Sequence, residues 1–138
     1  IDYGVVKLPG KKALQQRYAI LYDTFCTLLS NYQPDFVAIE NPFVLKKNMP
    51  SSIKLSGVKV ALMIACEKAG ITIMECSATQ AKKAVTGYGK ANKGSIQKGM
   101  QALLSLHEPP EPADAADALA VAYWLGNTLK WSHSCTNI

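Results

Sequence analysis

A short apolar run, Phe36 to Ile39, constrains the fold most, because it ends abruptly in Glu40 and an Asn-Pro pair. A continuous apolar run of this length, bounded by turn residues, is typical of a strand buried on both faces. Glu40 then lies at the carboxyl end of the strand, where open α/β sheets bind their ligands. The run predicts an α/β sheet with a carboxylate at its functional edge. The plainer alternative is that Glu40 is a surface acid at a strand end.

Strand and helix patterns alternate along the rest of the chain, which favours an α/β domain. We expect strands at 1–8, 35–40 and 71–76 and helices at 11–32, 51–68, 77–86, 95–106 and 114–131. A length of 138 residues, 49% of them hydrophobic, suffices for one domain with a sizeable core. We therefore assign residues 1–131 to one domain and residues 132–138 to a polar C-terminal tail.

Two acids three residues apart, Asp114 and Asp117, stand among alanines at the start of the last expected helix. Residues at i and i+3 share a helix face, so both carboxylates can reach one point, and the small neighbours let another element come close. Together with Glu40, they suggest a magnesium-dependent enzyme that acts on phosphates. Alternatively, Asp114 only caps the helix and Asp117 only faces its dipole.

The positive charge of the chain is concentrated in its middle. Between residues 46 and 98 there are ten lysines and two glutamates, a local charge of +8, whereas the remainder holds five basic and eight acidic residues. This division suits a polyanion that lysines hold and a carboxylate cluster cuts, although the lysines could also serve only solubility. Arg17 is the only arginine, which points toward backbone or shape recognition rather than base readout.

Several other classes of protein fit the sequence poorly. The four cysteines have no Cys-x-x-Cys spacing and there are only two histidines, which argues against a zinc site. No stretch resembles a membrane span or a signal peptide, so we expect a cytoplasmic protein with no membrane partner.

A glycine-rich loop, Gly87 to Gly94, lacks the spacing of a P-loop or a dinucleotide fingerprint. Its lysines, Lys90 and Lys93, make contacts to a nucleic-acid backbone more plausible than a nucleotide site. Phe43 follows Glu40 by three residues and could stack beside a base, or could instead fold onto the core.

In this order along the chain, several motifs together resemble the RuvC family of Holliday-junction resolvases. They are Pro34-Asp35-Phe36-Val37-Ala38-Ile39-Glu40, Phe43, Gln80-Ala81-Lys82-Lys83-Ala84-Val85 leading into Gly87-Tyr88-Gly89, Lys93, and Ala113-Asp114-Ala115-Ala116-Asp117-Ala118-Leu119-Ala120. The resemblance implies an RNase H-like α/β fold with a mixed central sheet flanked by helices. It also implies a homodimer, a divalent metal, and paired symmetric nicks in four-way junction DNA.

The resemblance also assigns roles to individual residues. Glu40, Asp114 and Asp117 match three of the family's four metal-binding carboxylates, which implies two Mg²⁺ ions per site, for which Mn²⁺ can substitute. Lys82 and Lys93 match lysines near the scissile phosphate. We expect DNA contacts from Phe43, Lys46, Lys47, Lys83 and Lys90. A branch-migration motor complex is an expected partner.

The fourth carboxylate of the family lies in an Asp-x-Gly motif on its first strand. Asp2-Tyr3-Gly4 offers such a motif, but the following helix and the spacing to Glu40 place residues 1–8 at the family's third strand. We therefore expect the first two strands to be absent, and the chain alone to be poorly stable and inactive.

The expected helix at 51–68 corresponds to the family's dimer interface. Its small residues Ser56, Gly57, Ala61 and Ala65 would permit close packing, as they also would in an ordinary core helix. Two other functions stay open: a related RNase H-like nuclease or transposase-type enzyme, and a junction-binding module that does not cut.

Overall fold

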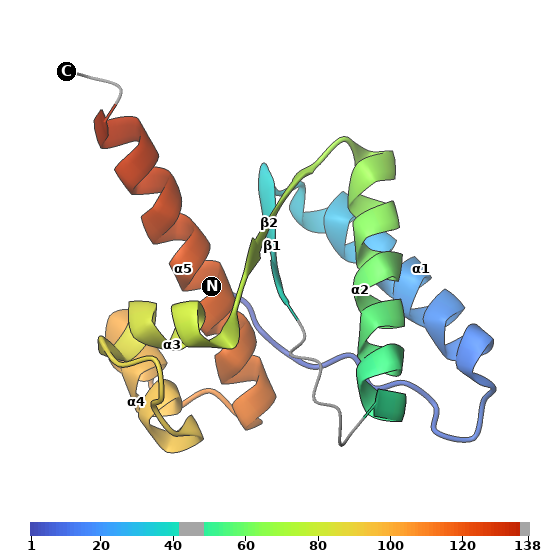
Figure 1. The fold of residues 1–138 in the computed structure, drawn as a ribbon, viewed down its shortest axis with the longest axis horizontal. Coiled ribbons are helices and arrows are strands. Elements are labelled where there is room, and N and C mark those ends of the chain that lie inside the picture. Colours follow the sequence, from blue (N-terminus) through green and yellow to red (C-terminus); the bar gives the residue numbers. More distant parts are fainter. Residues whose placement is uncertain (42–48, 136–138) are drawn as a thin grey trace. The chain divides into compact units, whose positions relative to one another are not determined.

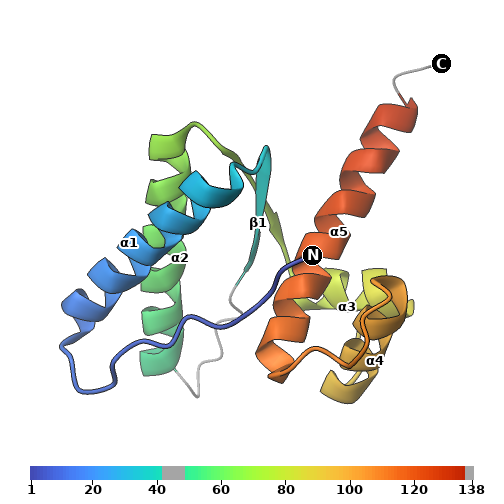
Figure 2. The same ribbon diagram turned by 180° about the vertical axis from the view of Figure 1, so that it is seen from behind.

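The computed structural model describes residues 1–41 and 49–135, apart from the side chains of residues 49, 50, 52 and 131–135. Residues 6–74 form one compact unit. Residues 1–5 and the chain from residue 75 onward form the other. Figures 1 and 2 show the chain from two opposite sides.

The unit of residues 6–74 pairs two helices with a small sheet. Its elements are α1 (Leu14–Tyr32), β1 (Phe36–Glu40), α2 (Met49–Ala69) and β2 (Thr72–Cys76), the last of which runs on into the other unit. β1 and β2 are hydrogen-bonded neighbours in a two-stranded parallel sheet, with α2 as the crossover between them (Figure 1). α1 and α2 lie side by side in both views (Figures 1 and 2). This is the β-α-β arrangement that alternating patterns predict.

The core of this unit lies where the two helices meet the sheet. Leu29 of α1 and Ala65 and Cys66 of α2 are buried together, and Val37 and Ile73 of the two strands pack against them. Because β1 contributes Val37 to this core, the face of β1 that carries Val37 and the buried Ile39 is the one toward the helices.

A close approach between α1 and α2 explains one of the small residues of α2. The Tyr18 hydroxyl donates a hydrogen bond to the Lys54 carbonyl, 3.0 Å away. A methyl group on Gly57 would meet that hydroxyl at 2.5 Å, so a larger residue here would force the Tyr18 ring or the helix to shift. Gly57 and Ala65 therefore serve packing within the chain, as the core-helix alternative expected.

The other unit consists of three helices, α3 (Ala78–Thr86), α4 (Lys93–Leu103) and α5 (Ala113–Cys135), which pack on one another. Ser77 caps α3, as the sequence predicts: its side chain accepts from the Gln80 N–H, and Gln80 reaches back to the Ser77 N–H. Gly87 ends α3 with a positive φ of 76°, which glycine adopts without strain. Ile96 and Met100 of α4 are completely buried.

The predicted strand at residues 1–8 is wrong, because the structure has no helix or strand there. Ile1, Tyr3, Val5 and Val6 are exposed. A strand holds only when its backbone groups pair with a neighbour, and among the described residues β1 and β2 are the only paired strands. Strand propensity alone therefore did not order this segment.

The remaining expected elements are confirmed, with shifted ends. α4 begins at Lys93 rather than at Ser95, and α5 continues to Cys135. Within residues 1–41 and 49–135, no helix is both long and apolar enough to cross a bilayer.

Candidate active site

The beginning of α5 carries Asp114 in its first turn and Asp117 about one turn later. Between them, Ala115 and Ala116 are 1% and 0% exposed, while Asp114 is exposed and Asp117 half-buried. α5 packs on both α3 and α4, and a larger side chain at the alanine positions would hold these helices apart. The small alanines therefore allow the close packing that the sequence predicts, and the two acids lie along the edge of the packed face.

Asp114 does not cap α5, because the helix begins at Ala113 and Asp114 lies within its first turn. A carboxylate there still meets the positive end of the helix dipole. The N-cap interpretation of Asp114 is therefore wrong.

Lys93 reaches Asp114 from the start of α4. The Asn92 side chain caps α4 by accepting from the Ser95 N–H at 2.9 Å, which makes Lys93 the first helical residue. From there the Lys93 ammonium donates a hydrogen bond to Asp114 Oδ1 at 3.1 Å. The hydrogen bond and charge of Asp114, with a further contribution from Asp117, raise the pKa of Lys93 above its ordinary value. Lys93 is thus a fully charged ammonium at neutral pH, beside two carboxylates.

Glu40 ends β1 as the sequence predicts, and it is exposed. It belongs to the unit of residues 6–74, whereas Asp114 and Asp117 belong to the other unit. The structure thus confirms the local setting of all three acids: two on one helix face and one at a strand end.

The donor chemistry of these acids fits magnesium. Carboxylate oxygens are the hard ligands that Mg²⁺ takes, usually one or two from the protein together with water and substrate phosphate. Asp114 and Asp117 supply such a pair on one face of α5. Over the described ranges 1–41 and 49–135, no group of three or more acidic, histidine or cysteine side chains is arranged so that it could hold a metal ion.

The lysines expected near DNA have different settings. Lys82 and Lys83 lie in α3, Lys82 half-buried and Lys83 exposed in the last turn. Lys90 is exposed in the segment between α3 and α4. Phe43, Lys46 and Lys47 lie outside the described residues.

One contact near Glu40 was missed from the sequence. Lys59 of α2 donates a hydrogen bond to the side chain of Asn41, the residue directly after Glu40. The spacing along α2 could have indicated that Lys59 faces the strands, because Lys59 lies seven residues before the buried Cys66 and so shares its side of the helix.

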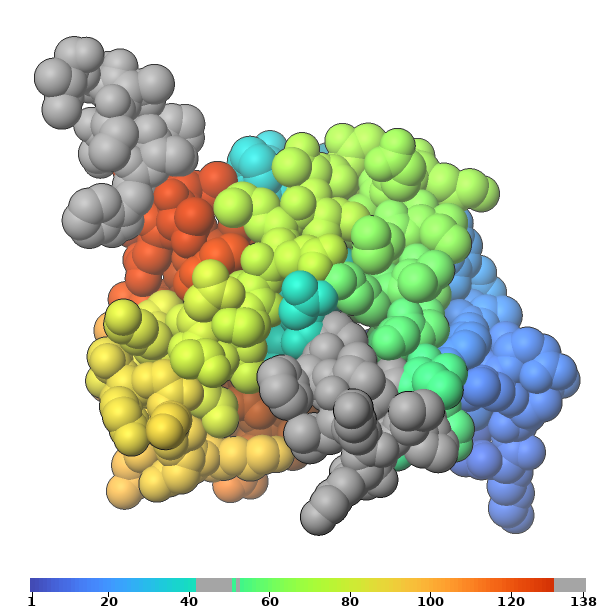
Figure 3. Space-filling view, in the orientation of Figure 1, coloured from blue at the N-terminus to red at the C-terminus, as the bar shows by residue number. Residues whose placement is uncertain are grey.

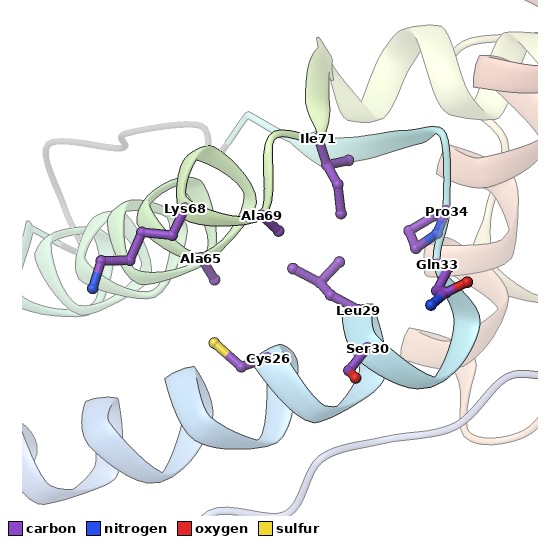
Figure 4. A pocket seen from close by; sticks show the side chains of 9 residues that line it. All are labelled: Cys26, Leu29, Ser30, Gln33, Pro34, Ala65, Lys68, Ala69 and Ile71. Atoms are coloured by element: carbon purple, nitrogen blue, oxygen red, sulfur yellow. The ribbon is translucent and has the colours of Figure 1, made fainter.

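A cavity of about 490 Å³ lies away from this strand end. It opens between the C-terminal ends of α1 and α2, with Leu29, Ala65 and Ile71 pointing into it and Cys26 and Lys68 at its side (Figure 4). Pro34 and Ile71 of its lining precede β1 and β2, so it lies at the amino ends of the strands. Glu40 is at the opposite end, and the cavity is not part of the candidate site.

The sequence matches the model of a known protein family and is similar to members of that family. The model of the family "Crossover junction endodeoxyribonuclease RuvC" matches residues 1–124. A protein of that name from Caldicellulosiruptor saccharolyticus is 40% identical over 122 residues, which cover 88% of this chain and 73% of the relative. Another from Clostridioides difficile is 35% identical over 138 residues, covering 100% of this chain and 81% of the relative.

Two solved structures share the fold. Thermus thermophilus RuvC has a TM-score of 0.83 and 26% identity, with 94% of this chain and 77% of that chain covered. T. thermophilus RuvC in complex with Holliday junction substrate has a TM-score of 0.81 and 28% identity, with 88% and 73% covered. The expectation of an RNase H-like α/β fold is confirmed.

Proposed function

The chain belongs to the RuvC family of crossover junction endodeoxyribonucleases, and on that premise we propose that it resolves four-way DNA junctions by paired, symmetric phosphodiester hydrolysis. The observation that carries the proposal is the Lys93–Asp114 contact beside Asp117, which brings a cation to two carboxylates proposed as metal ligands. A related protein, T. thermophilus RuvC, has been solved with a Holliday junction substrate. A junction-binding module that does not cut is not favoured, because the relatives are named as nucleases.

Glu40, Asp114 and Asp117 would hold two Mg²⁺ ions, or Mn²⁺ in their place. When bound, the metal acts as a Lewis acid on the phosphate and makes a bound water more acidic. In this proposal the carboxylates would be the protein ligands of the metal, and Asp114 is exposed, as a site that also takes a phosphate from the DNA requires.

Lys93 and Lys82 would neutralise charge that grows on the phosphate during hydrolysis. A lysine ammonium keeps its proton at physiological pH, and the hydrogen bond to Asp114 holds the Lys93 ammonium beside the proposed metal ligands. Because Lys93 starts a capped helix, its backbone is fixed while its long side chain can turn from Asp114 to a phosphate.

The DNA would lie along the basic middle of the chain. Lys83 and Lys90, which are both exposed, would contact the phosphate backbone, and contacts from Lys46, Lys47 and Phe43 are proposed from the sequence alone. Backbone contacts from lysines supply affinity for a junction without reading its sequence, in keeping with a structure-specific enzyme.

A homodimer would supply the two sites that symmetric nicking needs. Ile53, Val60 and Ile64 of α2 are exposed, and their spacing places them on one side of the helix. Figure 3 shows α2 open to view along much of its length. The side of α2 that carries Ile53, Val60 and Ile64 is the proposed subunit interface. We further propose that the dimer works in the cytoplasm with a branch-migration motor.

A cleavage assay tests the function. The protein carrying this chain is incubated with a four-way junction, a matched linear duplex, or an RNA/DNA hybrid, with Mg²⁺ or with EDTA. Paired nicks in the junction alone, dependent on Mg²⁺, support the proposal. Cleavage of the hybrid in preference would indicate another RNase H-like nuclease, and junction binding without any product would indicate the non-cutting module.

A further inference from the structure

The hydrogen bond from Lys59 to Asn41 joins the middle of α2 to the end of β1. The two residues are 18 positions apart and both belong to the unit of residues 6–74. Asn41 directly follows Glu40, so this contact fixes the chain within one residue of a proposed metal ligand.

Strand geometry determines on which side this contact lies. Val37 packs into the core with α1 and α2, and Ile39 is buried. Because side chains alternate along a strand, Asn41 continues the same side, and its bond to α2 agrees with that direction. Glu40 is on the other face, with Phe36 and Ala38. Lys59 therefore contacts the end of the strand on the side of the helices, whereas the alternation of side chains places Glu40 on the opposite face.

Helix geometry explains why a lysine fits at this point. Lys59 lies seven residues before Cys66, which is completely buried, and the two share one side of α2. Lys59 itself is half-buried, as expected when the aliphatic stem lies along the apolar side and the ammonium extends to the polar end of the strand. A side chain that is too short to reach Asn41, or that carries no hydrogen-bond donor, could not make this bond.

The backbone at Asn41 is also restricted by the residue that follows it in the sequence. The next residue is Pro42, and a residue before proline is confined to extended conformations. The proline thus limits the direction of the main chain, and Lys59 holds the side chain of Asn41.

We infer that Lys59 is a positioning residue for Glu40: its ammonium, through the Asn41 side chain, holds the end of β1 so that the Glu40 carboxylate keeps one orientation. Lys59 touches neither DNA nor metal in this role. The inference rests on the proposed function, in which Glu40 is a metal ligand. Groups that orient a ligand in this way are commonly worth about 10- to 100-fold in metal affinity or activity.

A set of variants in the protein carrying this chain tests the inference. Lys59→Met removes the ammonium but keeps the stem, and Asn41→Ala removes the acceptor. Each should lower kcat on a junction about 10- to 100-fold. The double variant should be no slower than either single variant, because both lose the same bond. Lys59→Arg keeps a donor and should recover most of the rate. Junction affinity, measured in Ca²⁺ to prevent cleavage, and the melting temperature should change little.

Two further measurements are needed. The first tests whether the loss of charge alone explains the effect, and the second detects the bond without a cleavage assay. Lys11→Met removes the same charge from an exposed position outside the basic middle and should cut at the wild-type rate. In the metal-free protein, the Lys59 ammonium should give a slowly exchanging NMR signal that Asn41→Ala abolishes.

The outcomes distinguish this inference from the proposed function. If Glu40→Gln is inactive while Lys59→Met cuts at the wild-type rate, the positioning role is wrong and the function stands. If the two single variants add fully in the double variant, the shared bond is not the cause, and the inference is again wrong. If Glu40→Gln itself cuts normally, the metal-ligand assignment fails, and with it the premise.

Discussion

Lys93 and Asp114, 21 residues apart in sequence, are joined at the starts of two different helices by a hydrogen bond of 3.1 Å. α4 begins at Lys93 and α5 one residue before Asp114, so both side chains extend from first turns that tertiary packing brings together. Asp114 is therefore hydrogen-bonded to Lys93 and is also a proposed ligand of the metal ion.

Asp114→Asn should abolish nicking and leave junction binding nearly intact. The amide removes a ligand's charge but leaves the lysine surface unchanged. We expect the cleavage rate to fall about 100-fold or more, the usual size for electrostatic groups at a reacting centre. Single-turnover cleavage and a gel-shift titration in Ca²⁺ measure the two quantities. Glu108→Gln, which neutralises an exposed acid before α5, is the matched control. A variant that cuts at a near wild-type rate would show that the site is misassigned.

The same Asp114→Asn variant should lower the pKa of Lys93 toward its ordinary value. Asp114 is the main cause of the increase, and the smaller contribution of Asp117 remains. Because the folded-state pKa is raised, the stabilisation from this pair is complete below the ordinary lysine pKa and is lost as the pH rises through the folded value. Between pH 6 and pH 9, roughly the range of enzyme assays, Lys93 should therefore not titrate. NMR titration of the Lys93 side chain tests both statements, and an unchanged pKa in the variant would contradict the contact.

Replacing Lys46 and Lys47 together by Ala should weaken junction binding and flatten its dependence on salt. These residues lie outside the described part of the chain, so the prediction rests on their place in the basic middle. Each lost phosphate contact should reduce the slope of log K against log salt by about 0.9 for duplex DNA. Lys11 and Lys12 form a second adjacent pair, outside the basic middle, and their replacement should leave the slope unchanged. Equal slopes for both double variants would place residues 46 and 47 away from DNA.

Gly57→Ala should destabilise the protein, although alanine is the better helix former. The added methyl would meet the Tyr18 hydroxyl, and overpacking of this kind usually costs about 1–3 kcal/mol. Gly126→Ala in α5 has open space around the new methyl and should stabilise by about 0.5–1 kcal/mol. Urea unfolding of both variants gives the comparison. The packing of α1 on α2 would be in doubt if both substitutions were stabilising.

The sequence predicted the elements whose signals are local. β1 was clear from four apolar residues ended by an acid, and α3 from its capping serine. The segment at residues 1–8 had strand-like residues too, but pairing decides whether a strand forms, and pairing is not encoded locally.

The candidate site was predictable in its parts but not in its contacts. The spacing of Asp114 and Asp117 gave a shared helix face, since that follows from helix geometry alone. The contact between Asp114 and Lys93 depends on how α4 packs against α5, which the sequence does not give. The predicted helix begins at Ser95, two residues too late, because the prediction does not recognise Asn92 as the N-cap. The bond between Lys59 and Asn41 depends in the same way on the packing of α2 against the strand.

The buried Ala115 and Ala116 affect how variants of this protein should be interpreted. Neither methyl group has any chemistry to contribute, yet a bulkier residue at either position would shift the backbone that carries both acids. A mutational scan scored only by DNA cleavage would therefore flag these alanines as strongly as the carboxylates. A second measurement, such as protein abundance or melting temperature, distinguishes the two kinds of position. Replacing Ala115 or Ala116 should lower it, whereas replacing Asp114 or Asp117 should not.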